Sequence, residues 1–139
     1  MEIKIREMTA GDYPQVIELW RACEGIGLSA DDTQEGIGSY LSHNPGLSFV
    51  AEQEGQVVGA VLVGQDGRRG YLNHLAVKPS HRNLGIGSEL VRASLSALRA
   101  MSIRKCHIFV FADNLGVLTF WKKVGWEERS DLKILSTWI

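Results

Sequence analysis

Two glycines just after a basic residue mark the part of the sequence best suited to holding an anion. Arg82 stands three residues before Gly85, and Gly87 follows. An expected strand, residues 71–77, precedes this turn, and an expected helix, residues 85–101, begins in it. Glycine lets a ligand approach the backbone closely, and the first amides of a helix are unpaired and carry a positive partial charge. The pattern indicates a phosphate or pyrophosphate site, with an ordinary tight turn as the alternative interpretation.

Two common phosphate-binding loops are excluded by single residues. A nucleoside-triphosphate loop ends in Gly-Lys-Ser/Thr, whereas Gly87 is followed by Ser88 and Glu89. A dinucleotide fingerprint requires a third glycine at the position of Leu90. A nucleotide-binding domain of another kind is therefore a disfavoured interpretation.

The elements around the glycine turn follow from hydrophobic periodicity. Three successive expected strands with short connections imply an antiparallel meander, and a later strand–helix–strand unit implies a parallel pair. The sequence therefore predicts an α+β fold with a mixed sheet and packed helices, in one domain over residues 1–139. The expected strands are 2–7, 47–52, 56–64, 71–77, 105–111 and a last strand or hairpin from Trp126; the expected helices are 9–24, a short one ending at Leu41, 85–101 and 114–124.

Composition excludes several classes of protein. The 139 residues carry a formal net charge of -1, so there is no basic surplus for nucleic acid. The longest apolar run, Val57–Val63, is too short to span a bilayer, and the first residues do not form a signal peptide. Cys23 and Cys106 lie far apart without a CxxC pattern, which predicts a reducing cytoplasm and no metal site.

Two segments carry a resemblance to the GNAT acetyltransferase superfamily. Arg82-Asn83-Leu84-Gly85-Ile86-Gly87 is similar to its acyl-CoA signature, Gln/Arg-x-x-Gly-x-Gly/Ala. Residues 114–126 resemble its late motif, in which Asn opens a helix that ends in aromatic-x-x-x-Gly-aromatic. With the element order, the resemblance covers essentially the whole chain. It implies the GNAT fold, with a mostly antiparallel sheet flanked by helices, and a single N-acetyltransferase domain. The implied activity is transfer from acetyl-CoA to a primary amine of a small molecule or peptide, and a homodimer is left open.

The resemblance also implies which residues hold acetyl-CoA. The pantetheine arm would pair with main-chain groups in a gap between the strands at 71–77 and 105–111, the amides of the glycine turn would hold the pyrophosphate, and the late motif would contact the pantetheine arm. The implied residues are Leu75, Val77, Arg82, Asn83, Leu84, Gly85, Ile86, Gly87, Ser88, Asn114, Phe120 and Trp121.

The residues that usually transfer protons in the family are absent. Trp121 occupies the position of a Tyr acid, and an indole N–H donates hydrogen bonds without useful acidity. Tyr71 stands where many relatives carry Glu. The candidates for proton transfer are therefore Tyr71, Asn73 through a bound water, and His74, whose alternative role is a packed, hydrogen-bonded histidine. Strand alternation predicts His74 on the face opposite Tyr71 and Asn73. These departures support a second hypothesis, a non-catalytic acyl-CoA-binding module.

The acceptor pocket is expected among residues 20–41 and 65–70. Trp20, at the end of the first helix, and Asp66 and Arg69, in the loop before the motif strand, are the candidate substrate-binding residues. The alternative interpretations are a core tryptophan and a solvated turn.

Overall fold

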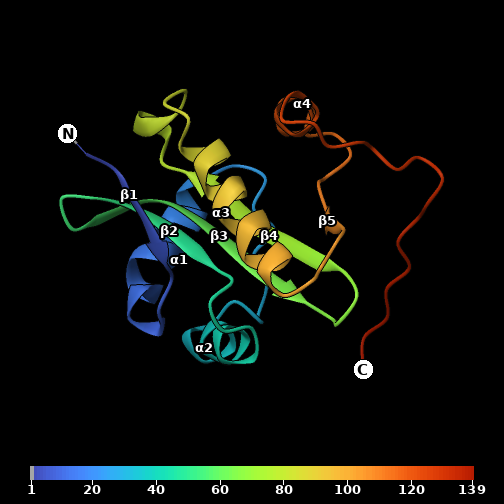
Figure 1. Ribbon diagram of the computed structural model, residues 1–139, viewed down its shortest axis with the longest axis horizontal. Helices are drawn as coiled ribbons and strands as arrows, with labels where there is room; N and C mark the ends of the chain where they lie inside the picture. The colour runs from blue at the N-terminus through green and yellow to red at the C-terminus, as the bar shows by residue number, and fades with distance from the viewer. Residues whose placement is uncertain (1) are drawn as a thin grey trace. The chain divides into compact units, whose positions relative to one another are not determined.

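A five-stranded mixed sheet organises the larger of two compact units. The computed structural model describes residues 2–139, and the chain divides after Phe109 into this larger unit and a smaller one, Val110–Ile139. The strands lie in the order β1-β2-β3-β4-β5, antiparallel except for the parallel pair β4 and β5 (Figure 1). The predicted meander followed by one parallel pair is confirmed. The strands are β1 (Lys4–Glu7), β2 (Phe49–Gln53), β3 (Gln56–Gln65), β4 (Gly70–Val77) and β5 (Cys106–Ile108).

Helices cover both faces of the sheet in the larger unit. Trp20 of α1 and Ile37 of α2 share a buried cluster with Ala60 of β3. On the other face, a Cβ atom at Gly59 would lie 3.1 Å from a methyl carbon of Leu90 in α3. Helix α3 therefore packs directly on β3. The helices of this unit are η1 (Ala10–Asp12), α1 (Tyr13–Ala22), α2 (Gln34–His43), η2 (Pro79–His81) and α3 (Ile86–Ala100).

Local sequence explains the central strand and its hairpin. Val57–Val63 is buried throughout because helices cover both faces of β3, which accounts for a continuous apolar run instead of an alternating one. The hairpin between β2 and β3 turns on Glu54 and Gly55, with φ of 51° and 80°. Both positive φ angles match the twist of a two-residue hairpin turn, as the sequence predicts.

Two predicted strands differ in the structure. The strand expected at 105–111 is limited to β5, and within the described residues no strand follows Trp126. The smaller unit instead contains α4 (Leu115–Lys123), followed by Gly125 with φ of 98°. Alternating apolar residues produce a strand only when a partner strand supplies hydrogen bonds, and the smaller unit has none among its described residues.

An ion-pair network joins β1, β2 and η1. Arg6 contacts both carboxylate oxygens of Asp12, at 2.8 and 2.9 Å, and Glu52 at 2.7 Å. The same carboxylate accepts a hydrogen bond from the main-chain N–H of Thr9 at 2.8 Å. The Arg6 guanidinium, aided by Thr9 and opposed by burial, holds the pKa of Asp12 below its ordinary value. Asp12 is 7% exposed, so this network is protected from solvent.

Asp12→Asn should lower the free energy of unfolding by about 2 kcal/mol at neutral pH, because a charged hydrogen-bonded group is lost. Since the pKa is lower in the folded protein, the carboxylate stabilises the fold above its unfolded pKa of about 3.9 and loses this effect as pH falls through the folded pKa. Urea unfolding at neutral pH and at pH of about 2 should show the difference from wild type shrinking in acid. Glu18→Gln, an exposed carboxylate on α1, is the control. An equal cost of Asp12→Asn at both pH values would contradict the role of its charge.

Candidate active site

The second half of β4 has an unpaired main-chain edge. β5 pairs only with Gly70–Leu72, and no strand among residues 2–139 pairs with Asn73–Val77 on that side. An unpaired edge offers N–H and C=O groups to an extended ligand. The main-chain carbonyl of Val77 already accepts a hydrogen bond from Nε of Arg82 at 3.2 Å, which ties the end of β4 to the following turn.

The glycine turn combines left-handed residues with the start of a long helix. Asn83 and Gly85 have φ of 64° and 81°, and Gly85 is the N-cap of α3. Alternating left-handed residues direct successive N–H groups toward one concave surface, which binds anions. A Cβ atom at Gly85 would meet nothing within 4 Å, so the glycine serves the backbone angle and leaves space for a ligand. The helix dipole of the fifteen-residue α3 adds a positive partial charge at this turn, which also favours an anion.

A β-bulge interrupts β4 beside its unpaired edge. The register of β3 against β4 shifts so that Val61 lies opposite two residues, His74 and Leu75. His74 has φ of 51°, in the left-handed region that few residues other than glycine adopt. The prediction that His74 faces away from Asn73 is wrong, because the extra residue of the bulge lets both line the same pocket.

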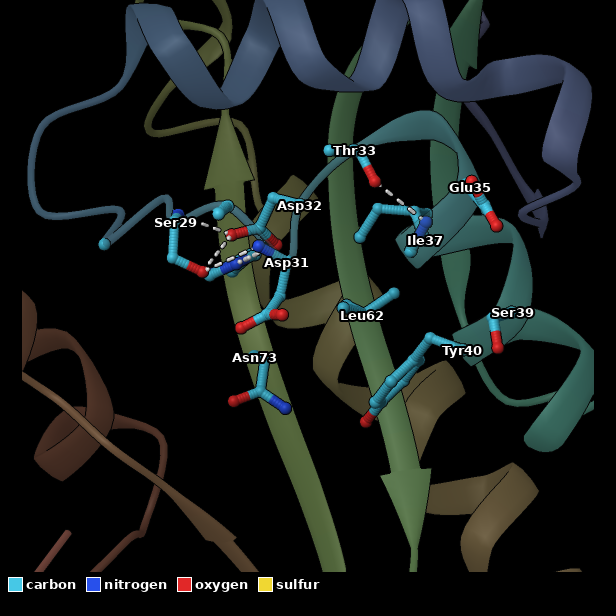
Figure 2. Close-up of a pocket in the computed structure, with 14 residues that line it drawn as sticks. Ser29, Asp31, Asp32, Thr33, Glu35, Ile37, Ser39, Tyr40, Leu62 and Asn73 are labelled. Atoms are coloured by element: carbon cyan, nitrogen blue, oxygen red, sulfur yellow. Dashed lines mark hydrogen bonds and ion pairs between the residues drawn. The ribbon is translucent and has the colours of Figure 1, made fainter. Parts of the chain in front are cut away.

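That pocket has a volume of about 610 Å³ and lies between the α1–α2 loop, α2 and the β3–β4 strands. Figure 2 shows Asp31 and Asp32 on the loop, across the pocket from Tyr40 of α2. Glu35 contributes a third carboxylate, and no Lys or Arg is among the described residues that line the pocket. The lining residues are Gly27, Ser29, Ala30, Asp31, Asp32, Thr33, Glu35, Gly36, Ile37, Ser39, Tyr40, Leu62, Asn73 and His74.

His74 is held from two sides. Nε2 of its ring lies 3.0 Å from Oδ1 of Asp32. Its main-chain carbonyl accepts a hydrogen bond from Nε1 of Trp20 at 2.8 Å, and the two rings pack edge to face at 4.9 Å. Trp20 is 1% exposed and does not line the pocket, so it supports His74 from the core instead of contacting a substrate as predicted.

Tyr40 and Asn73 form a polar pair in the pocket. Burial raises the pKa of the Tyr40 phenol, while its hydrogen bond with Asn73 acts in the opposite direction. The phenol lies over β3 at Gly64, where a Cβ atom would stand only 2.2 Å from the Tyr40 oxygen. Burial thus favours the neutral phenol, whose hydroxyl can donate a hydrogen bond to a ligand.

Three predicted residues lie outside this pocket. The Tyr71 hydroxyl is 3.5 Å from an oxygen of Asp66, and its ring stacks on Phe109 at 6.3 Å. The other oxygen of Asp66 accepts the N–H groups of Arg68 and Arg69, both at 2.8 Å, and these bonds hold the pKa of Asp66 below its ordinary value. The structure thus shows Asp66 closing its own exposed turn and does not bring it, Arg69 or Tyr71 to Asn73 and His74.

The smaller unit contains the late motif. Oδ1 of Asn114 accepts the N–H of Val117 at 3.2 Å and caps α4, so the prediction that Asn opens this helix is confirmed. Trp121 is buried and packs on Trp126, with ring centres 4.6 Å apart, and edge to face on Phe120. The expected contacts of Asn114, Phe120 and Trp121 with a pantetheine arm stay predictions.

Sequence reasoning expected a pocket among residues 20–41 and 65–70, and the observed pocket includes residues 27–40, but it named none of the individual pocket residues of the α1–α2 loop and α2. The available signal was the acidic pair Asp31–Asp32, with Glu35 soon after, in a glycine-rich segment without basic residues. Nothing in that pattern indicated that Asp32 would meet His74, which lies 42 residues away in the sequence. Tyr40 carried no signal beyond its place on the expected helix.

Metal-binding clusters and membrane-spanning helices are both absent from residues 2–139. These residues contain no group of three or more His, Cys, Asp or Glu side chains placed to hold a metal ion. None of their helices has the length and apolar character needed to cross a membrane.

Comparison with known proteins identifies relatives over most of the chain. Residues 13–126 match the family described as the acetyltransferase (GNAT) family. An acetyltransferase of Sodalis glossinidius (strain morsitans) is 32% identical over 96% of this chain and 93% of its own length. An acetyltransferase of Pectobacterium atrosepticum is 34% identical over 90% of this chain and 88% of its own length.

Solved structures share the fold. The PaiA N-acetyltransferase of Thermoplasma acidophilum, solved in complex with coenzyme A, has a TM-score of 0.82 at 19% identity and matches over 91% of each chain. AAC(6')-Iy, solved with the bisubstrate analog CoA-S-monomethyl-acetylneamine, has a TM-score of 0.80 at 18% identity over the full length of both chains. With the family match and the curated relatives, these findings show that the chain belongs to the GNAT family and is an acetyltransferase.

Proposed function

We propose that this acetyltransferase moves the acetyl group of acetyl-CoA to a primary amine that enters the pocket as a cation. The observation that carries the choice of acceptor is the pocket's charge: three carboxylates, from Asp31, Asp32 and Glu35, and no lysine or arginine among the described lining residues. Carboxylates attract a cation and repel an anion, and the half-buried Asp32 is screened by water less than the exposed Asp31 and Glu35. A free amino acid or a phosphorylated sugar would bring a negative group that these residues do not pair.

The glycine turn fits the pyrophosphate of acetyl-CoA. Left-handed Asn83 and Gly85, the open space at Gly85 and the helix dipole of α3 are the features that support this assignment. The edge of β4 near Leu75 and Val77 suits the extended pantetheine arm. We include Asn114, Phe120 and Trp121 of the smaller unit in the donor site on the likeness of their motif to the family pattern.

The reaction requires a base because an ammonium group cannot attack a carbonyl carbon. We assign this role to His74, since its imidazole lines the pocket together with the polar side chains of Asn73 and Tyr40. The amine nitrogen forms a bond with the thioester carbon, and the bond from that carbon to sulfur breaks. Of the two protons that the ammonium group loses, one passes through His74 to solvent and the other goes to the departing thiolate. Tyr71 is left out of this set because its hydroxyl is directed to Asp66.

Trp121 stands at the position of the family's Tyr acid and packs against Trp126, and its indole does not supply a proton to the departing thiolate. The non-catalytic acyl-CoA-binding module that the sequence left open is not carried further, because the family match and the curated relatives make the chain an acetyltransferase. Mass-spectrometric detection of acetylated product across polyamines, aminosugars, amino acids and peptides tests the proposed acceptor class. Acetylation of cationic amines in preference to zwitterionic amino acids supports it, whereas acetylation of amino acids at an equal or greater rate would contradict it.

Gly85→Glu should weaken coenzyme A binding more than about 100-fold, or about 2.7 kcal/mol, because it places a side chain and a negative charge at the glycine turn. Calorimetry with the folded variant measures the change. Gly67→Glu is a matched control, since Gly67 has φ of 93° and equally open surroundings in the β3–β4 turn, at the opposite end of β4 from the glycine turn. Equal affinity in Gly85→Glu and wild type would disprove the assignment of the turn.

Asp31→Asn should raise KM for a cationic acceptor about fivefold and leave kcat nearly unchanged, because a partly solvated charge contributes about 1 kcal/mol to binding. Initial rates at saturating acetyl-CoA, with added salt as a second variable, check this expectation. The rise in KM should diminish at high salt, since ions screen exposed charges. A fall in kcat with constant KM would instead place Asp31 in the chemical step.

A further inference from the structure

We propose that Asp32 is a positioning residue that holds His74 in the tautomer protonated at Nε2, so that Nδ1 accepts the proton of the acceptor amine. This inference deepens the proposed function and rests on its assignment of His74 as the base. The observation behind it is the contact of 3.0 Å between Oδ1 of Asp32 and Nε2 of His74. A carboxylate can only accept there, so the neutral ring must donate from Nε2.

Asp32 is fixed before any substrate arrives. Its second oxygen, Oδ2, accepts the main-chain N–H of Ser29 at 2.8 Å. Its main-chain N–H donates to the carbonyl of Ser29 at 3.1 Å, and its own carbonyl accepts the hydroxyl of Tyr13 at 2.7 Å. With the backbone and both carboxylate oxygens engaged, Asp32 presents Oδ1 to His74 at little cost in conformational entropy.

His74 is fixed as firmly from the other side. Its left-handed backbone in the bulge is a conformation that persists only where the surroundings impose it, and Trp20 contributes through both its N–H and its ring. Among residues 2–139, no hydrogen bond to Nδ1 of His74 is found. The arrangement therefore commits one ring nitrogen to Asp32 and leaves the other for chemistry.

Titratable groups from two neighbouring segments line the same pocket as His74. Asp32 and Asp31 lie on the loop, and Glu35 and Tyr40 lie on α2. Helix α1 packs on His74 through Trp20, and β3 contributes Leu62 to the pocket wall; neither residue is titratable. When Nδ1 takes a proton, the imidazolium that results is stabilised by the adjacent Asp32 carboxylate, while the acceptor nitrogen gains the electron pair needed to form the C–N bond.

The conservative variant Asp32→Asn makes this inference sharply testable. The Ser29 N–H must still find an oxygen at the Oδ2 position, so the new amide NH₂ takes the Oδ1 position and faces Nε2. An NH₂ group donates, which forces Nε2 to accept and moves the ring proton to Nδ1. The variant thus keeps the shape of Asp32 and reverses the tautomer of His74.

Nitrogen-15 NMR of the histidine rings at alkaline pH reads the tautomer directly, with the His74 signals identified by their absence from His74→Gln. We expect the Nε2–H tautomer in wild type and the Nδ1–H tautomer in Asp32→Asn. We also expect kcat for the acceptor amine to fall at least about tenfold in Asp32→Asn, because the base is misprotonated. Glu24→Gln, a matched carboxylate-to-amide change at an exposed residue of the same loop that does not line the pocket, should keep the wild-type tautomer and kcat.

The outcomes separate this inference from the proposed function. A His74 ring protonated at Nδ1 in wild type, or full kcat in Asp32→Asn, would overturn the role of Asp32. The wild-type spectrum alone tests the role of Asp32 even if the Asp32→Asn variant does not fold. Failure to acetylate any amine would overturn the proposed function and the base role of His74 with it, while the tautomer would still decide whether Asp32 orients the ring.

Discussion

One extra residue in β4 brings Asn73 and His74 to the same pocket of the larger unit. A regular strand would direct Asn73 and His74 to opposite faces, one toward the pocket and one under α3. The bulge at His74 removes this alternation, and the left-handed backbone there is maintained by the hydrogen bond from Trp20. The same strand then loses its parallel partner, so that its main-chain edge and its polar side chains lie next to each other.

The two ends of this arrangement suit reactants of opposite charge. The glycine turn at Gly85 presents N–H groups and a helix dipole to an anion, whereas the pocket presents carboxylates to a cation. β4 connects these two regions, since it ends at the turn and supplies Asn73 and His74 to the pocket. In the proposed reaction, a polyanionic donor and a cationic acceptor would thus meet along one strand without competing for the same surface.

The local sequence pattern predicted those structural features that depend only on residues close together in the sequence. The glycine turn, the meander and the N-terminal cap of α4 by Asn114 follow from residues a few positions apart, and all are found in the structure. The bulge, the contact of Asp32 with His74 and the burial of Trp20 depend on elements that meet only after folding. Alternation in the last segment was a weak signal because a strand needs a partner that its sequence does not specify.

The absence of a side chain at Gly64 of β3 helps to set the shape of the pocket. The Tyr40 phenol occupies the space that any side chain at Gly64 would need. A one-nucleotide change from a glycine codon to an alanine codon would displace that ring and alter the wall on the α2 side, while the strand itself tolerates alanine. The shape of the proposed acceptor pocket can therefore diverge between descendant proteins through a position that does not line it.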